Sequence, residues 1–268
     1  MYTYRNITLE VADRVATITL NRPEVGNAFH ATSYPEIRGA FEACGADPEV
    51  GAVIITGAGK NFSAGGDIKG FKKNIENGTY INPDSVRRAG MMSQAARKCP
   101  KPVIAMVNGA AAGAGCSLAL ACDFRILTPK SKLILAFINM GLPGDTGAMY
   151  YAVRHLGVAK TIEMLMTGDP VDGEKADKLG LVTILAEEDK LAETTYAFAK
   201  KMAAKPLYAI KRQKEILYNY FAGGNTPFTL EDYTDTEAES MAECSRTADY
   251  AEAVNAFLEK RSPQFIGR

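Results

Sequence analysis

Residues 101–123 read KPVIAMVNGAAAGAGCSLALACD, and this stretch decides the fold of the chain. From Val103 to Cys122 no residue is charged, and such a run has about the length of a membrane-spanning helix. Asn108 and several glycines interrupt it, however, and alanine supplies much of its apolar content. Interrupted apolar runs of this kind are typical of a short buried strand, a turn and a buried helix. The sequence therefore predicts a strand over residues 102–107 and a helix over residues 115–122.

The same order of strand and glycine-rich loop occurs at residues 51–57, GAVIITG, which precede FSAGGDIK at residues 62–69. In the segments that follow, strand-like apolar runs alternate with stretches of helical periodicity, which predicts an α/β fold with mostly parallel strands. Expected strands are 124–127, 133–137 and 181–185, and expected helices are 148–156, 160–166 and 173–179.

The two ends of the chain differ in kind. Residues 7–11 and 15–20 have the pattern of a hairpin, and Ser33 with Glu36 has the spacing of a helix capping box. After residue 188 the strand signals stop, and the sequence predicts long helices. These helices are 189–204, 206–221 and 230–260, with a break at residues 223–225.

We therefore expect a core over residues 1–200 and a helical region over residues 201–268. Residues 70–90 are polar and turn-rich, which is typical of a surface loop or a substrate lid. In the last helix Val254, Phe257 and Leu258 share a face that indicates core or subunit contact.

The composition excludes several classes of function. The chain has 268 residues, and its 31 Lys and Arg balance its 31 Asp and Glu, so no global basic field is present to hold nucleic acid or an anionic membrane. Five cysteines form no CxxC pair, and two histidines have no nearby cysteine to complete a metal site. We expect no metal, and a reduced, cytoplasmic location, since MYTYRNITLE has no pattern of a secretory leader.

The glycine-rich loops do not match two common phosphate-binding motifs. Residues 57–61 lack the Ser or Thr and the upstream glycine of a P-loop, and residues 113–115 lack the third glycine of a dinucleotide fingerprint. The loops at 62–69 and 108–116 can instead aim two backbone N–H groups at one carbonyl oxygen, which is an oxyanion hole. Close packing of a helix on a strand explains the same glycines about as well.

Motifs along almost the whole chain resemble the crotonase (enoyl-CoA hydratase/isomerase) superfamily. They are VATITLNRPEVGNAF, AVIITGAGKNFSAGGDIK, KPVIAMVNGAAAGAGCSLALACD, GLPGDTG, TGDPVDGEKADKLGLV and FLEKRSPQF. The resemblance implies a ClpP/crotonase-like spiral of ββα repeats with a helical C-terminal trimerisation region. It also implies an acyl-CoA thioester as substrate, no separate cofactor, and a homotrimer or a dimer of trimers.

Roles carried over from the resemblance fall on particular residues. The backbone N–H groups of Gly66 and Ala114 match those that hold the thioester carbonyl. The expected lining of the coenzyme A channel is Ala64, Asp67 and Ile68. Weaker candidates for the coenzyme A phosphates are Arg22, Lys260 and Arg261, for which a solvated charge is the simpler reading.

The chain departs from the hydratase pattern of this family, which uses two glutamates. Ser117 and Phe137 stand in those places, and neither exchanges a proton usefully at neutral pH. Asp145 remains, in the loop where the isomerase branch commonly carries its single acid/base. For that role its pKa should be raised by an apolar pocket, which Phe137, Leu142 and Met149 could supply. The alternative for Asp145 is a helix N-cap.

These residues favour an enoyl-CoA isomerase, with three alternatives. The first is a hydratase or hydrolase that activates water through Asp145. The second is chemistry like that of 4-chlorobenzoyl-CoA dehalogenase, because the GDTG segment resembles the loop of that enzyme. That branch also uses a Trp and a His in its pocket, but this chain has no Trp and neither of its histidines falls at the matching position. Tyr150 and Tyr151 could orient a substrate or belong to the core. The third is an acyl-CoA-binding protein without catalysis.

Overall fold

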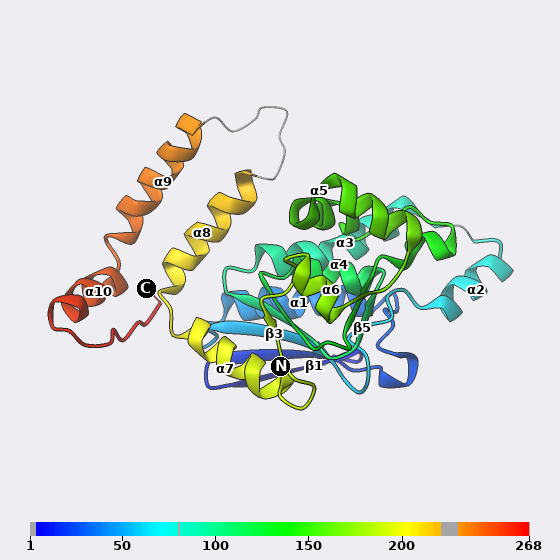
Figure 1. Cartoon of the computed structure of the whole chain (residues 1–268), viewed down its shortest axis with the longest axis horizontal. Helices are drawn as coiled ribbons and strands as arrows, with labels where there is room; N and C mark the ends of the chain where they lie inside the picture. The colour runs from blue at the N-terminus through cyan, green and yellow to red at the C-terminus, as the bar shows by residue number, and fades with distance from the viewer. Residues whose placement is uncertain (1–3, 80, 221–229, 268) are drawn as a thin grey trace.

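The computed structural model describes residues 4–79, 81–220 and 230–267, drawn in colour in Figure 1. Strands and helices alternate through the first two thirds of the chain, and helices alone follow. The strands are β1 (Ile7–Ala12), β2 (Val15–Leu20), β3 (Ala52–Gly57), β4 (Val103–Val107), β5 (Ala110–Ala112), β6 (Phe124–Leu127), β7 (Lys132–Ile134), β8 (Val171–Asp172) and β9 (Ile184–Leu185). The α-helices are α1 (Ser33–Ala46), α2 (Ile68–Glu76), α3 (Pro83–Lys98), α4 (Ala114–Ala121), α5 (Ala148–Thr167), α6 (Gly173–Lys178), α7 (Leu191–Ala203), α8 (Leu207–Tyr220), α9 (Leu230–Cys244) and α10 (Ala248–Leu258). Two 3-10 helices, η1 (Pro23–Val25) and η2 (Ala136–Met140), complete the list.

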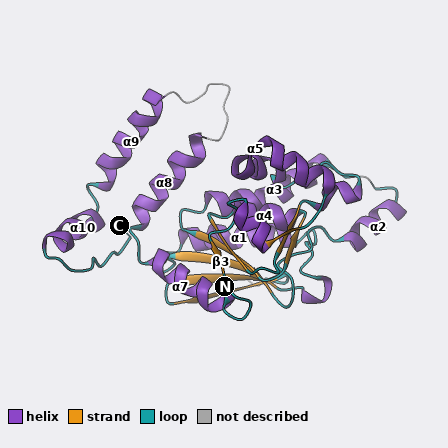
Figure 2. Cartoon of the chain, in the orientation of Figure 1, coloured by secondary structure: helices purple, strands orange, loops and turns teal. Residues whose placement is uncertain are grey.

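The strands form two sheets, which Figure 2 shows in orange. The larger sheet has the order β1-β2-β3-β4-β6-β9, and only its first pair, β1 with β2, is antiparallel. The smaller sheet has the order β5-β7-β8, with β5 parallel to β7. The prediction of an α/β fold with mostly parallel strands is confirmed.

The stretch that decides the fold forms β4, β5 and α4. All five residues of β4 and all eight residues of α4 are buried. Asn108 follows β4, and its side-chain amide donates to the carbonyl oxygens of Gly57 and Gly59 at 2.8 and 2.9 Å, which ties this loop to the loop after β3. No helix in the described part of the chain is long and apolar enough to span a membrane.

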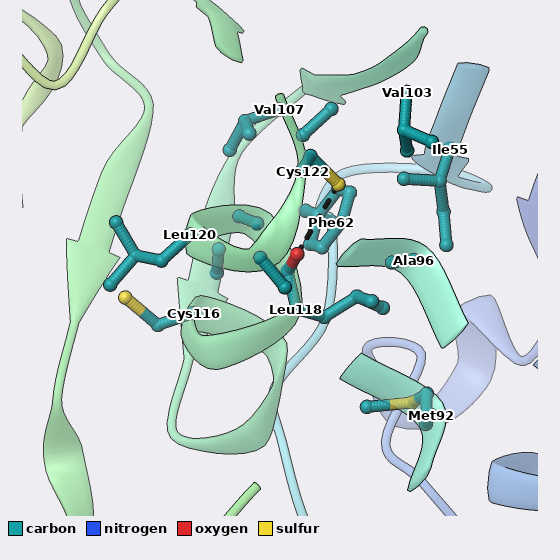
Figure 3. Close-up of a cluster of buried hydrophobic side chains, with 14 of the residues drawn as sticks. Ile55, Phe62, Met92, Ala96, Val103, Val107, Cys116, Leu118, Leu120 and Cys122 are labelled. Atoms are coloured by element: carbon teal, nitrogen blue, oxygen red, sulfur yellow. Dashed lines mark hydrogen bonds between the residues drawn. The ribbon is translucent and has the colours of Figure 1, made fainter. Parts of the chain in front are cut away.

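Helix α4 lies at the centre of the main hydrophobic core (Figure 3). Leu118 and Leu120 are fully buried, and the thiol of Cys122 donates to the Leu118 carbonyl at 3.3 Å. Phe62 and Met92 belong to the same core, which therefore joins α3 and α4 to the loop after β3. Burial of this kind fixes the position of the N-terminal end of α4 relative to both glycine-rich loops.

The expected capping box of α1 is wrong. The Ser33 hydroxyl accepts from the His30 N–H at 3.1 Å, and the residue at the N-cap, Thr32, makes no side-chain capping bond. Glu36 instead accepts from the backbone N–H groups of Arg5 and Asn6 at 3.1 and 2.8 Å. The glutamate thus fastens α1 to the start of β1, a tertiary contact that outweighs the local one.

Three segment boundaries also differ from expectation. The strand expected over 133–137 ends at Ile134, and η2 follows it; the strand expected over 181–185 begins only at Ile184. The helix expected over 230–260 is divided between α9 and α10, because the Thr247 hydroxyl accepts from the Tyr250 N–H and starts a new helix. The expected break at residues 223–225 lies outside the described residues.

Residues 70–90 belong mostly to two helices rather than to a loop. Asp67 caps α2 by accepting from the Lys69 N–H at 3.2 Å, and Asn82 caps α3 by accepting from the Asp84 N–H at 2.8 Å. Both caps follow the usual preference for Asp and Asn at this position. Figure 1 shows α2 projecting from the edge of the core.

The C-terminal helices are fastened to the core through α8. The Lys214 ammonium, almost fully buried, lies 2.6 Å from a carboxylate oxygen of Asp123 and donates to the Lys101 carbonyl at 2.9 Å. The Tyr218 hydroxyl donates to the other Asp123 oxygen. Beyond this anchor, α9 and α10 extend away from the core (Figure 1). The division at residue 200 stays a prediction.

The apolar face of α10 does not pack against the described part of this chain. Phe257 and Leu258 are 83% and 71% exposed, and Val254 is 40% exposed. Of the two expected roles for this face, a place in the core of the chain is wrong. Contact with another subunit stays a prediction.

Gly109 offers a test of how closely the two loops pack. A Cβ atom on Gly109 would lie 2.0 Å from the carbonyl oxygen of Lys60, so backbone must move to accept it. We expect Gly109→Ala to lower the free energy of unfolding by about 2 kcal/mol or more. Gly39→Ala is the control, because nothing lies within 4 Å of its Cβ position in α1 and alanine favours a helix. Urea unfolding of both variants measures the difference, and equal stability would contradict the packing.

Candidate active site

The two glycine-rich loops lie side by side because their backbones pair. The Ser63 N–H donates to the Ala110 carbonyl at 3.0 Å, and the Ala112 N–H donates to the Ser63 carbonyl at 2.8 Å. Gly115, in the first turn of α4, sits so close to Ser63 that a Cβ would lie 2.7 Å from the serine Cβ. This close approach holds the start of α4 against the loop after β3.

Where these loops meet, the N–H groups of Gly66 and Ala114 have no acceptor in the described part of the chain. Ala114 is the first residue of α4, and the first N–H groups of a helix have no partner inside it. Gly66 is bracketed by backbone bonds, from the Phe29 N–H to Gly65 and from the Asp67 N–H to Phe29, at 2.7 and 3.2 Å. Among the described residues, neither the Gly66 N–H nor the Ala114 N–H has an acceptor. The pair therefore fits the expected oxyanion hole.

A cavity of about 200 Å³ contains both residues. Most of its lining is apolar or backbone, and it is built from α1, α2, α4, η2 and the loops between them. The lining residues are Tyr34, Ala64, Gly66, Ile68, Phe71, Gly113, Ala114, Ala136, Phe137, Asn139, Met140, Leu142 and Asp145. A small, largely apolar cavity with a few polar groups is typical of a small-molecule site.

Asp145 reaches this cavity from the loop between η2 and α5. One of its carboxylate oxygens, Oδ1, accepts from the Thr146 hydroxyl at 3.1 Å. Burial raises the pKa of Asp145 above its ordinary value, and the bond from Thr146 opposes that change only in part. The N-cap of α5 is Gly147, with no side-chain capping bond, so the alternative role for Asp145 is wrong.

Of the apolar neighbours expected for Asp145, two line the cavity and one does not. Phe137 and Leu142 line it, and the Phe137 ring comes within 3.6 and 3.7 Å of Cβ positions built on Gly144 and Gly113. Met149 is 48% exposed and outside the lining, which corrects that expectation. Met149 and Tyr150 lie on the exposed side of the first turn of α5, whereas Ala148 and Tyr151 are buried.

Ser117, at the other position where the hydratases of the family carry a glutamate, makes only contacts within the protein. Ser117 is fully buried in α4, where its hydroxyl donates to the Gly113 carbonyl at 3.3 Å. Of the described residues that line the cavity, Asp145 alone carries a carboxylate. A pair of carboxylates for the addition of water is therefore not assembled by these residues.

The three expected channel residues have different surroundings. Ala64 and Ile68 line the cavity. Asp67 does not; it pairs with Arg22 at 3.2 Å, which holds both side chains beside the loop. Burial acts to raise the pKa of Asp67, but hydrogen bonds from Arg22 and from backbone N–H groups outweigh it and lower the pKa. Asp67 therefore neutralises Arg22, which weakens that arginine as a phosphate ligand.

The remaining sequence candidates lie away from the cavity. Arg261 follows α10 and pairs with Glu252 at 2.6 Å, and Lys260 precedes it at the helix end. Neither residue lines the cavity, and α10 lies at the opposite end of the molecule from α2 (Figure 1). The Tyr151 hydroxyl is buried against Ser93 at 3.4 Å, so this tyrosine belongs to the core.

Neither histidine lines the cavity. His30 is exposed and lies three residues before α1 begins. Burial lowers the pKa of His155 to about 4, and its Nε2 lies 3.1 Å from the Leu120 carbonyl. Within residues 4–79, 81–220 and 230–267, no cluster of His, Cys, Asp or Glu has the arrangement of a metal site.

Two lining residues, Tyr34 and Phe71, were missed by sequence reasoning. A Cβ on Gly66 would lie 2.7 Å from the tip of the Phe71 ring, so this ring covers the Gly66 side of the cavity. Tyr34 is an aromatic on α1, where a core position is the usual reading, and Phe71 falls within residues 70–90, where the sequence predicts a surface loop or lid. No spacing in the sequence connects either of them to Asp145.

Comparison with known proteins gives a consistent result along the chain. A family model described as enoyl-CoA hydratase/isomerase matches residues 10–268. A trans-2-decenoyl-[acyl-carrier-protein] isomerase of Streptococcus mutans is 33% identical over 99% of both chains. A 1,2-epoxyphenylacetyl-CoA isomerase of Escherichia coli is 34% identical over 98% of both chains. A crystal structure of an enoyl-CoA hydratase from Polaromonas sp. JS666 is 30% identical, covers 97% of this chain and 99% of its own, and superposes with a TM-score of 0.89.

Proposed function

Because this chain belongs to the enoyl-CoA hydratase/isomerase family, we propose that it is an isomerase that moves a carbon–carbon double bond within an acyl-CoA thioester. That it is an acyl-CoA enzyme of the crotonase fold follows from its family and its structural relatives. The proposal concerns the reaction, since relatives of comparable identity are named as isomerases and as hydratases.

The observation that carries the proposal is the single carboxylate of the cavity. Asp145 faces the same cavity as the free N–H groups of Gly66 and Ala114, and burial raises its pKa. A raised pKa suits a group that must both take and return a proton near neutral pH. Addition of water in the two-glutamate manner needs a second acid or base, which the lining residues do not supply.

The reaction uses these groups in turn. The Asp145 carboxylate takes a proton from the α-carbon, C2, of a β,γ-enoyl thioester, and negative charge develops on the thioester oxygen. The N–H groups of Gly66 and Ala114 donate to that oxygen and stabilise the dienolate. Asp145 then returns the proton at C4, so the double bond moves from C3–C4 to C2–C3 and no atom is gained or lost.

The alternatives are separated by the fate of solvent oxygen. We expect 3-hexenoyl-CoA, incubated with the enzyme in water enriched in oxygen-18, to give 2-hexenoyl-CoA of unchanged mass. Supplied instead with 2-hexenoyl-CoA, a hydratase that activates water through Asp145 gives a heavier 3-hydroxyacyl product. A hydrolase gives a heavier free acid from either thioester. An acyl-CoA-binding protein without catalysis binds the thioester and gives no product. Dehalogenation is less favoured, since no histidine lines the cavity in the described residues.

The pH dependence of the reaction follows from the raised pKa of Asp145. The first step needs the deprotonated carboxylate, so kcat/KM falls as the pH drops through this pKa. Because burial raises the pKa, the acid limb should lie above about pH 4, the ordinary range of an aspartate. Thr146→Val removes the hydrogen bond that lowers the pKa and should move the limb to higher pH. A limb that stays in place in this variant would contradict the assignment of the titrating group.

We also propose that the chain assembles into a trimer or a dimer of trimers. The exposed apolar face of α10, with Phe257 and Leu258, supports contact with another subunit. Sedimentation at several protein concentrations tests this part, and a monomer at all of them would refute it.

A further inference from the structure

Tyr34 places a polar group in the cavity that the proposed reaction does not use. It is in the first turn of α1, and its ring packs edge-on against Phe29, with the ring centroids 5.5 Å apart. The backbone of Phe29 in turn brackets Gly66 through the bonds to Gly65 and Asp67. Tyr34 is therefore held in a fixed relation to one of the two oxyanion donors.

Tyr34 lines the cavity, and no described residue makes a hydrogen bond with its hydroxyl. No hydrogen bond joins it to the Asp145 carboxylate, although both line the same cavity. Burial, and then the negative charge of Asp145, raise the pKa of Tyr34, so the hydroxyl keeps its proton at neutral pH and is available as a donor. A hydroxyl donor that has no protein acceptor in an apolar site is available to a bound ligand.

The position and charge of the lining restrict what the acceptor can be. The thioester oxygen already has two donors in Gly66 and Ala114, so the acceptor belongs to another part of the acyl group. The described lining contains no cationic side chain, and Asp145 disfavours a second anion nearby. The acceptor that fits is a neutral oxygen, in a hydroxyl, ketone or ether group.

On the basis of the proposed isomerase function, we propose that Tyr34 determines specificity by donating a hydrogen bond to a neutral oxygen carried by the acyl chain close to the reacting carbons. The preferred substrates are then oxygen-bearing β,γ-enoyl thioesters rather than plain alkenoyl ones. The bond is made to the substrate in the ground state as well as in the transition state, so its loss acts mainly on binding.

The test compares two substrates that differ in one hydroxyl, 3-hexenoyl-CoA and 5-hydroxy-3-hexenoyl-CoA. In the unmodified enzyme kcat/KM should be about tenfold higher for the hydroxylated thioester, the effect of roughly one hydrogen bond. Tyr34→Phe should reduce this ratio to about one, chiefly through a higher KM for the hydroxylated substrate. Tyr196→Phe is the matched control, because it removes a surface hydroxyl that pairs with Thr17 outside the cavity.

Equal kcat/KM for both substrates in the unmodified enzyme would overturn the proposal. So would a Tyr34→Phe variant in which both substrates lose activity by the same factor, since that result assigns Tyr34 to Asp145 or to the dienolate. Binding of hexanoyl-CoA and 5-hydroxyhexanoyl-CoA, which do not isomerise, measures the same preference by calorimetry. This arm depends on no reaction, so it separates failure at Tyr34 from failure of the isomerase assignment.

Discussion

Asp145→Asn is expected to lower kcat for the conversion of 3-hexenoyl-CoA to 2-hexenoyl-CoA by about a thousandfold or more. The amide has nearly the same shape as the carboxylate and can still accept from the Thr146 hydroxyl, so the loop before α5 should keep its conformation. It cannot take a proton from C2, however, and a positioned general base contributes about 10²–10⁴-fold to a rate. We expect a loss in the upper part of that range because Asp145 performs both proton transfers.

The control for this variant is Asp169→Asn, which changes an exposed aspartate outside the cavity and should leave kcat unchanged. Binding of hexanoyl-CoA, measured by calorimetry, should be nearly the same for Asp145→Asn and the unmodified protein, because the thioester contacts remain. An Asp145→Asn variant that is fully active would refute the role of Asp145. A variant that is inactive and also fails to bind would indicate a folding defect, which a thermal melt detects.

The part of the fold that could be predicted from sequence is the part in which local pattern and burial agree. Strands β3 and β4 are apolar runs that end at Gly57 and Val107, and all residues of helix α4 are buried because the core surrounds it. In such segments neither propensity nor tertiary context opposes the pattern. The assignment of Gly66 and Ala114 as N–H donors within their loops rests on the family resemblance rather than on the local pattern, and it stays a prediction.

The segments whose structure differs from the prediction are those in which a tertiary contact replaces a local one or in which a helix is short. Glu36 has the spacing for a capping box, but the free N–H groups at the start of β1 offer it partners that no local pattern reveals. Helix α2 is brief and rich in lysine, so its composition is that of a loop, although Asp67 caps it. Tyr34 and Asp145 face one cavity from distant parts of the chain, and nothing in one sequence states that proximity.

Ala114→Pro is expected to remove one oxyanion donor and leave the fold in place. Ala114 is the first residue of α4, a position at which proline is favoured because its missing N–H has no partner within the helix. The preceding residue, Gly113, has φ of 51° and ψ of −121°, outside the α region that proline disfavours in its neighbour. We therefore expect loss of the donor without loss of the helix.

Loss of one such donor costs about 10²–10³-fold in kcat, so the variant should be nearly as slow as Asp145→Asn. Exchange of the C2 protons of hexanoyl-CoA with deuterium from the solvent isolates the enolisation step, and it should slow by a similar factor. Ala114→Gly keeps the N–H and should retain most of the activity. Ala248→Pro places proline at the first position of α10, on the surface, and should be fully active.

The two variants together locate the charge that develops during the reaction. Removing the base stops proton removal from C2, whereas removing one donor raises the barrier to that proton removal. If Asp145→Asn abolishes C2 exchange and Ala114→Pro only slows it, the base and the oxyanion donor therefore act on the same enolate. A folded Ala114→Pro variant with unchanged kcat and unchanged exchange would place the thioester oxygen elsewhere. The free N–H groups at the start of α4 would then serve only to let the helix begin against Ser63.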